Sequence, residues 1–228
     1  MIKKFQNFFL DFLFPKFCFN CQKEGGYLCQ DCLSVLEISS SHQKYSTKNL
    51  ADLYFALSYE NILVKKLIQK FKYEPFIKEL AETLVLLIIT HFQLLDKRPN
   101  LSNFILVPIP LNEKRLRWRG FNQAEEIGKY LSEFLKLPLV SNCLLRVKNT
   151  YPQVELTAEA RKENVKDIFF CQNKREIFGK KILLVDDVYT TGATMEEAAR
   201  VLKEAGGKEI IGIVVARAAP GQDKFENI

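Results

Sequence analysis

The chain has 228 residues, of which 47% are hydrophobic and 26% are charged. This length allows one full domain and a small extra unit, and the composition excludes disordered, collagen-like and membrane-spanning proteins. The 33 Lys and Arg residues exceed the 27 Asp and Glu residues by 6, a mild positive excess that permits an anionic partner without identifying one.

The segment that ends at Pro15 has the pattern of an amphipathic helix. Its aromatic side chains fall on one helical face: Phe5, Phe8, Phe9 and Phe12. Polar residues interrupt it and no small-residue cleavage site follows, which argues against a secretory signal peptide. We expect this helix to pack on the protein's own body, and a helix lying on a membrane surface is the alternative. The other apolar run, Leu84 to Ile89, is too short to span a bilayer, so we expect no transmembrane segment.

Four of the 6 cysteines form two CxxC pairs close together: Cys18, Cys21, Cys29 and Cys32. Each CxxC turn presents two sulfurs at the separation that tetrahedral Zn²⁺ requires, so the pattern predicts a structural zinc site with four thiolates and no open catalytic position. A redox-active pair is the alternative, but it needs a single CxxC at the start of a helix. Since the chain is neither short nor secreted in character, its cysteines favour a reducing, cytoplasmic location.

The chain divides into three stretches. We predict an N-terminal helix and four-cysteine zinc ribbon in residues 1–38, a polar, exposed linker in residues 39–48 and one larger domain in residues 49–228. Apolar residues at helical spacing predict helices at 61–73, 77–95, 123–136 and 195–205.

Continuous apolar runs predict buried strands at 104–107, 182–185 and 210–216. Strands that are apolar on both faces and alternate with helices are typical of an α/β fold with a parallel sheet covered on both sides.

The segment from Leu183 to Met195 is the most informative in the sequence. A buried strand ends at Asp186 and Asp187, and a turn leads into a helix. At a helix N-terminus the backbone N–H groups and nearby hydroxyls bind phosphate, and the turn offers both: Thr190, Thr191, Gly192, Ala193 and Thr194. Adjacent acids at the carboxyl end of a strand can hold two vicinal hydroxyls. The segment therefore predicts a site for a ribose bearing a 5-phosphate. The alternative is an ordinary turn with solvated acids and Thr194 as helix cap.

This segment resembles the PRPP-binding motif of type I phosphoribosyltransferases, where PRPP is the pyrophosphate ester of ribose 5-phosphate. Other parts extend the likeness: Tyr59, Lys72, Tyr73, Val107 to Leu111, Arg115, Arg119 to Gln123, Leu145, Arg146, Thr150, Gln153, Leu156, Arg161, Asn164, Val165 and Phe169. Together with the cysteine-rich head they resemble the ComF family of competence-associated proteins. The resemblance runs from about Pro15 to Arg217.

The resemblance implies a type I phosphoribosyltransferase-like parallel sheet flanked by helices, with a small N-terminal zinc ribbon. It implies that Asp186, Asp187 and the Thr190 to Thr194 turn hold the ribose phosphate of PRPP. It also implies a mobile hood from Arg146 to Arg161 and a pyrophosphate loop that begins at Pro108, Ile109 and Pro110. The family is associated with natural transformation, which implies single-stranded DNA and other competence proteins as partners.

A basic stretch follows that loop, with Lys114, Arg115, Arg117 and Arg119 interleaved with Trp118. In one interpretation the guanidinium groups neutralise pyrophosphate, with Mg²⁺ bridging phosphate and ribose oxygens. In the other, the same residues bind single-stranded DNA, and Trp118 stacks on a base. Further lysines, Lys65, Lys66, Lys70 and Lys72, are expected on the solvent-facing side of a helix.

We therefore expect a ComF-like protein that handles incoming single-stranded DNA and binds PRPP or a related phosphate ligand. The alternative is an active phosphoribosyltransferase that moves phosphoribose from PRPP to a nitrogen nucleophile. There Asp186 and Asp187 would hold the sugar, and Arg115 and Arg119 would receive the departing pyrophosphate as catalytic residues. No residue identifies the acceptor.

Overall fold

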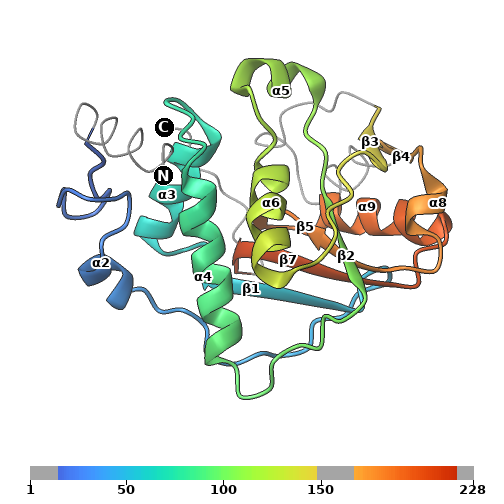
Figure 1. The fold of residues 1–228 in the computed structure, drawn as a ribbon, viewed down its shortest axis with the longest axis horizontal. Coiled ribbons are helices and arrows are strands. Elements are labelled where there is room, and N and C mark those ends of the chain that lie inside the picture. The colour runs from blue at the N-terminus through green and yellow to red at the C-terminus, as the bar shows by residue number, and fades with distance from the viewer. Residues whose placement is uncertain (1–14, 148–166, 220–228) are drawn as a thin grey trace, which may run out of the picture.

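A parallel sheet lies at the centre of the computed structural model, which describes residues 15–147 and 167–219. Its strands run in the order β1 (Asp52–Ser58), β7 (Glu209–Arg217), β5 (Lys181–Val185) and β2 (Phe104–Pro108), and the short β6 (Val188–Tyr189) pairs with the end of β7. The predicted parallel sheet is confirmed (Figure 1). Strand β1 was not predicted, although Leu53 to Leu57 form a short apolar run, because periodicity alone does not distinguish a run of this length from a buried helix segment.

Helices cover both faces of the sheet. α3 (Ile62–Lys72), α4 (Leu80–Leu94) and α6 (Gln123–Leu135) pack on one face, while α8 (Lys174–Ile177) and α9 (Ala193–Glu204) pack on the other. Alternate residues of β5 show the two sides. Leu183 and Val185 belong to the core with the first set of helices, and Ile182 and Leu184 belong to the core with the second. This alternation gives the three-layer arrangement that the apolar strands predicted.

The register of β2 and β5 brings two loops together. Pro108 pairs with Val185, and the next N–H, that of Ile109, donates to the Val185 carbonyl at 2.9 Å. Because parallel strands end at the same edge of a sheet, the chain after β2 and the chain after β5 leave the sheet side by side.

The basic stretch after β2 is a helix, α5 (Glu113–Arg119), which the sequence did not predict. Asn112 caps it by accepting a hydrogen bond from the Lys114 N–H at 2.9 Å, and Gly120 ends it in the left-handed conformation with φ of 80°. Asn112 and Gly120 are typical helix-end residues, but the segment between them is too short and too charged to show helical periodicity. In Figure 1 α5 stands at the carboxyl edge of the sheet, beyond the end of α6.

A small antiparallel pair stands apart from the main sheet. It consists of β3 (Leu144–Arg146) and β4 (Phe169–Cys171). Cys143 and Cys171 are buried here, as expected of cysteines that act as small apolar residues. The expected hood begins at Arg146, and its residues from 148 onward lie outside the described part of the chain.

The cysteine-rich head packs against α3 and α4 with α2 (Gln30–Ser34) at its end. Cys18 and Cys32 are buried in the same core cluster as those helices, and the Lys66 ammonium donates to the Phe19 carbonyl at 2.5 Å. The helix expected over Phe5 to Phe12 lies outside the described residues. Within those residues, no helix has the length and apolar character needed to cross a membrane.

The linker lies along the larger domain and contacts it at several points. The Ser39 N–H donates to the Ala56 carbonyl at 2.9 Å, and His42 Nε2 lies 2.9 Å from an Asp52 carboxylate oxygen. His42 and Tyr45 are half-buried, whereas most of the linker's other side chains are exposed as expected. The domain boundaries at residues 38 and 48 stay a prediction.

Candidate functional site

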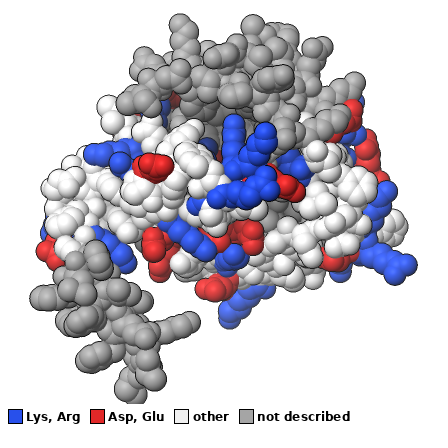
Figure 2. Space-filling model, turned by 90° about the horizontal axis from the view of Figure 1, so that it is seen from above, with Lys and Arg blue, Asp and Glu red and all other residues white. Residues whose placement is uncertain are grey.

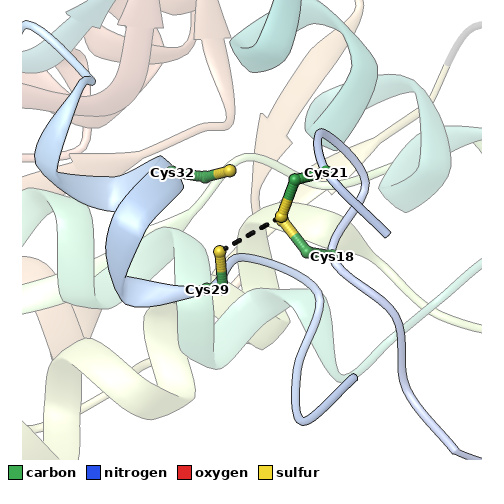
Figure 3. Close-up of side chains that lie close together, drawn as sticks. All are labelled: Cys18, Cys21, Cys29 and Cys32. Atoms are coloured by element: carbon green, nitrogen blue, oxygen red, sulfur yellow. Dashed lines mark hydrogen bonds between the residues drawn. The ribbon is translucent and has the colours of Figure 1, made fainter. Parts of the chain in front are cut away.

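The four cysteines of the head converge on one point, as Figure 3 shows. Their sulfur atoms all lie within 4.8 Å of one another, and those of Cys21 and Cys29 are 3.4 Å apart. Tetrahedral zinc with bonds of about 2.3 Å holds its sulfurs about 3.8 Å apart, so the set fits a four-thiolate zinc site. The Asn20 amide donates to the Cys32 sulfur at 3.3 Å, which helps to orient that ligand.

The surroundings of Cys18 favour the thiolate that a metal needs. Burial by itself raises the pKa of Cys18, but hydrogen bonds from the backbone of Cys21, Cys29 and Asn20 outweigh burial and lower the pKa to about 6. A thiolate at neutral pH is the form that binds zinc.

Removal of one thiolate is expected to release the metal. Protein prepared without chelator should carry about one zinc per chain, and Cys29→Ser should carry almost none, with a head that proteases cut and a sheet that stays folded. The control is Cys171→Ser, which removes a buried thiol outside the cluster and should leave the zinc content unchanged. Elemental analysis with limited proteolysis measures both, and wild-type protein free of zinc would contradict the assignment.

The acidic pair lies in the turn between β5 and β6, and β7 holds its backbone. The Asp186 N–H donates to the Ile213 carbonyl at 3.1 Å, and the Asp187 carbonyl accepts from Val215 at 3.0 Å and from Ala216 at 3.3 Å. Asp186 is half-buried, and Asp187 is only 6% exposed. Asp187 is therefore not the solvated acid of the alternative, since its backbone is bonded to strand β7 and its carboxylate is paired with Lys72 at the end of helix α3.

Lys72, the last residue of α3, forms an ion pair with the acidic turn. Its ammonium nitrogen lies 2.8 Å from a carboxylate oxygen of Asp187. Burial by itself lowers the pKa of Lys72, but Asp187 outweighs this and raises it, so the lysine is charged. The expectation of a solvent-facing Lys72 is wrong.

Arg119 lies within electrostatic reach of Asp187. This arginine is 9% exposed, and its guanidinium carbon lies 5.9 Å from the centre of the Tyr73 ring. Burial lowers the pKa of Arg119, while Asp187 acts in the opposite direction. Among the described residues, Arg119 Nε and Gln123 Nε2 are buried donors without a hydrogen-bond partner. Buried donors rarely stay unpaired, so this corner fits an anionic ligand with several oxygens.

Further basic residues surround the acids. Burial lowers the pKa of Arg146, Arg115 lowers it further, and Asp186 opposes both, so Arg115 and Asp186 each lie within electrostatic reach of Arg146. Figure 2 shows basic side chains gathered beside acidic ones in the middle of the face above the sheet edge. Such a mixed cluster can bind a ligand that carries both phosphates and hydroxyls.

The predicted phosphate turn leads into α9 as expected. Gly192 caps the helix with φ of 77°, and a side chain at this position would overlap the Tyr189 ring, so glycine is required twice over. The Thr191 hydroxyl accepts a hydrogen bond from the Ala193 N–H at 3.4 Å. Thr194 lies inside the first turn and is not the cap that the alternative assumed. The first N–H groups of a helix have no partner within it and can bind phosphate.

The remaining predicted residues take two different positions. Pro108, Ile109 and Pro110 lie next to the acidic turn, where β2 ends beside β5. The basic residues of α5, apart from Arg119, are exposed: Lys114, Arg115 and Arg117, together with Trp118. Lys72 and Gln123 were not among the predicted site residues, although both fall within or beside segments that carried the resemblance.

Asp186 has an unusual proton affinity for an aspartate. Burial raises its pKa, Asp187 adds to the rise, and Lys72 and Arg146 oppose it, with a net value of about 7. Ionisation of Asp186 above pH 4 therefore costs folding free energy in the ligand-free protein, since the unfolded chain gives up this proton near pH 4.

Asp186→Asn is expected to remove this cost. The free energy of unfolding of the variant relative to wild type should shift in favour of the variant as the pH rises from about 4 to about 7, and then level off. Urea unfolding of both proteins at about pH 5 and about pH 8 measures the shift. A difference between the two proteins that is the same at both pH values would contradict the raised pKa.

The chain is similar to known proteins in two ways, through a family model and through individual relatives. Residues 124–227 match the family model of the phosphoribosyl transferase domain, which covers α6, the acidic turn and the phosphate turn. The chain is 40% identical over 114 residues to "Competence protein F" of Haemophilus influenzae, covering 50% of each protein. It is 36% identical over 111 residues to "Competence protein ComFC" of Bacillus subtilis, covering 46% of this chain and 40% of that protein.

A third relative has a different name. "DNA utilization protein YhgH" of Escherichia coli is 34% identical over 105 residues, which cover 46% of this chain and 45% of that protein. The chain thus spans about half the length of the curated relatives it matches. With the phosphoribosyl transferase domain match and the four-cysteine cluster, these matches support the resemblance of the chain to the ComF family.

Proposed function

We propose that the chain binds PRPP or a related phosphate ligand at the carboxyl edge of its sheet and handles single-stranded DNA in natural transformation. One observation supports this most. The acidic turn, the start of α9 and the buried Arg119 lie at one edge, so hydroxyl-binding and phosphate-binding groups lie together. The names of the relatives, two competence proteins and a DNA utilization protein, favour the same setting.

In this proposal the two ends of the ligand have different partners. The acidic turn takes the ribose hydroxyls, the Thr190 to Thr194 turn takes the 5-phosphate, and the Pro108 to Pro110 loop takes the pyrophosphate together with Arg119. Bound Mg²⁺ would neutralise charge between the phosphate and ribose oxygens of PRPP. Buried arginines are suited to pyrophosphate because a guanidinium presents several donors in one plane.

The proposed DNA surface is α5 with the loop after α3. Trp118 is 53% exposed and packs edge-on against Phe76 with ring centres 4.7 Å apart, and Tyr73 nearby is 55% exposed. Exposed aromatic rings beside flexible basic side chains are typical of surfaces that stack bases and follow a phosphate backbone. Because Arg119 is buried, we assign it to pyrophosphate binding. We assign DNA binding to the exposed residues Lys114, Arg115 and Arg117.

We also propose a cytoplasmic location and contact with other competence proteins. The thiolates proposed to hold zinc need reducing conditions, and all 6 cysteines are free of disulfides. In this proposal the protein lies in the compartment that incoming single-stranded DNA enters.

The phosphate end is tested by removing hydroxyl donors. Replacing Thr190, Thr191 and Thr194 together by Val should weaken PRPP binding by about tenfold or more, since hydrogen bonds to a charged group contribute about 1.5–3 kcal/mol. Calorimetry with PRPP and Mg²⁺ measures this. Thr90→Val, which removes a hydroxyl bonded to the Leu86 carbonyl at 2.8 Å on α4, is the control. Equal binding by the triple variant would contradict the assignment.

Pyrophosphate release separates binding from transfer. The same wild-type protein is incubated with PRPP and candidate nitrogen nucleophiles, and released pyrophosphate is measured. Binding without release supports the proposed role in DNA handling. Release that depends on a nucleophile, and that Asp186→Asn abolishes, would instead establish the transferase alternative.

The DNA surface is tested by its salt dependence. Replacing Lys114, Arg115 and Arg117 together by Ala should weaken binding of single-stranded DNA of any sequence and make the salt slope shallower by up to about 2, at about 0.7 per lost phosphate contact. Fluorescence anisotropy with a labelled oligonucleotide at several salt concentrations measures both.

A matched control removes the same charge elsewhere. Lys174, Arg175 and Lys180 are exposed on and after α8, and their replacement by Ala should leave the slope unchanged. Trp118→Ala should weaken binding without changing the slope, because it removes stacking and no charge. A wild-type protein that binds no oligonucleotide at low salt would contradict direct DNA contact.

A further inference from the structure

The two adjacent acids differ in their surroundings. Asp187 is almost fully enclosed, and its carboxylate pairs with Lys72 at 2.8 Å. Asp186 is half-buried, and one of its oxygens accepts a hydrogen bond from the Asp187 N–H at 2.9 Å. Among the residues that the structure describes, no ion pair joins Asp186 to a cation. One acid thus has its charge compensated inside the protein, and the other keeps an oxygen for a partner from outside.

Lys72 is well placed to hold Asp187 rigidly. Its helix, α3, is anchored on the core by the fully buried Leu67, Ile68 and Phe71. The next N–H after Lys72, that of Tyr73, donates to the Gln69 carbonyl at 2.8 Å and closes the helix. The lysine therefore reaches the acidic turn from a fixed point, and its side chain is 24% exposed.

From this geometry we propose that the two acids have different roles. Lys72 is a positioning residue that holds Asp187 as a buried ion pair, and Asp186 is the acid that binds the ribose hydroxyls of the ligand. The assignment rests on the proposed function and makes it more specific. The ion pair with Lys72 also explains how the Asp187 carboxylate can be almost fully buried, whereas an acid that binds ligand hydroxyls has to be accessible.

A buried charge without a partner is costly. Loss of Lys72 leaves Asp187 enclosed without a partner, which destabilises the turn and moves it toward solvent. Asp186 shares that turn and receives the Asp187 N–H, so its orientation changes too. The effects of substitutions at the two members of one ion pair are not additive, so replacing both Lys72 and Asp187 should have about the same effect as replacing one of them.

The test measures thermal unfolding together with calorimetric binding of PRPP and of pyrophosphate alone. Asp186→Asn should weaken PRPP binding by about tenfold or more with no loss of stability. Lys72→Met should lower the melting temperature by several degrees and weaken PRPP binding by about tenfold, but it should leave pyrophosphate binding unchanged, since pyrophosphate has no ribose. Lys72→Arg should restore PRPP binding to within about threefold of wild type. Lys70→Met, which removes the same charge from the same helix, is the control.

The double variant keeps the test valid if Lys72→Met folds poorly. Lys72→Met with Asp187→Asn contains no unpaired buried charge and should be no less stable, and bind PRPP no more weakly, than Asp187→Asn alone. Additive losses would overturn the proposal. So would PRPP binding by Lys72→Met that equals wild type, or tighter binding, which would mean that the lysine competes with the ligand.

Failure of the proposed function gives a different result. Wild-type protein that binds neither PRPP nor pyrophosphate would overturn the function and this inference together. Wild-type protein that binds PRPP, with Asp186→Asn binding equally well, would overturn only the division of roles between the acids.

Discussion

Strand β7 is the constraint on which the rest of the structure depends. Its residues Glu209–Arg217 pair in parallel with β1, β5 and β6, so three other strands take their direction and register from it. The Val215 and Ala216 N–H groups donate to the Asp187 carbonyl, and the Ile213 carbonyl accepts from Asp186. The same strand thus forms the middle of the core and fixes the backbone of the acidic turn at the edge of the sheet.

Charge compensation is the second constraint. The edge of the sheet holds two acids with Lys72, Arg119 and Arg146 around them, in surroundings where a lone charge would be unstable. Lys72 and Asp187 compensate each other directly. A bound ligand would supply partners to two groups: Arg119, whose buried Nε has no hydrogen-bond partner among the described residues, and Asp186, whose pKa is raised to about 7. A ligand with phosphates and vicinal hydroxyls supplies partners to both.

Much of the fold followed from the sequence. The runs at 104–107, 182–185 and 210–216 are apolar on both faces, which only a parallel sheet covered by helices accommodates. The spacing of the two CxxC pairs predicted that the four cysteine sulfurs would lie close together. Strand β1 was missed because its short apolar run could equally belong to a buried helix. Helix α5 was missed because it is short and mostly charged.

The acidic turn and the phosphate turn were also found in the sequence, but the partners of the acids were not. Lys72 lies 115 positions before Asp187 in the chain, and only the packing of α3 on the sheet brings them together. Helical periodicity placed Lys72 with its exposed neighbours, since a residue at the end of a helix has surroundings that its own helix does not determine. For the same reason the burial of Arg119 could not be derived from the basic stretch that contains it.

The central claim is that the sheet edge binds a ribose phosphate through its hydroxyls and its phosphate at once. Calorimetry with ribose 5-phosphate and with 2-deoxyribose 5-phosphate tests it directly, because the two ligands differ only in one hydroxyl. Tighter binding of ribose 5-phosphate by about tenfold is expected, since its 2-hydroxyl donates to a carboxylate of the acidic turn. Equal affinity for the two sugars would contradict the claim.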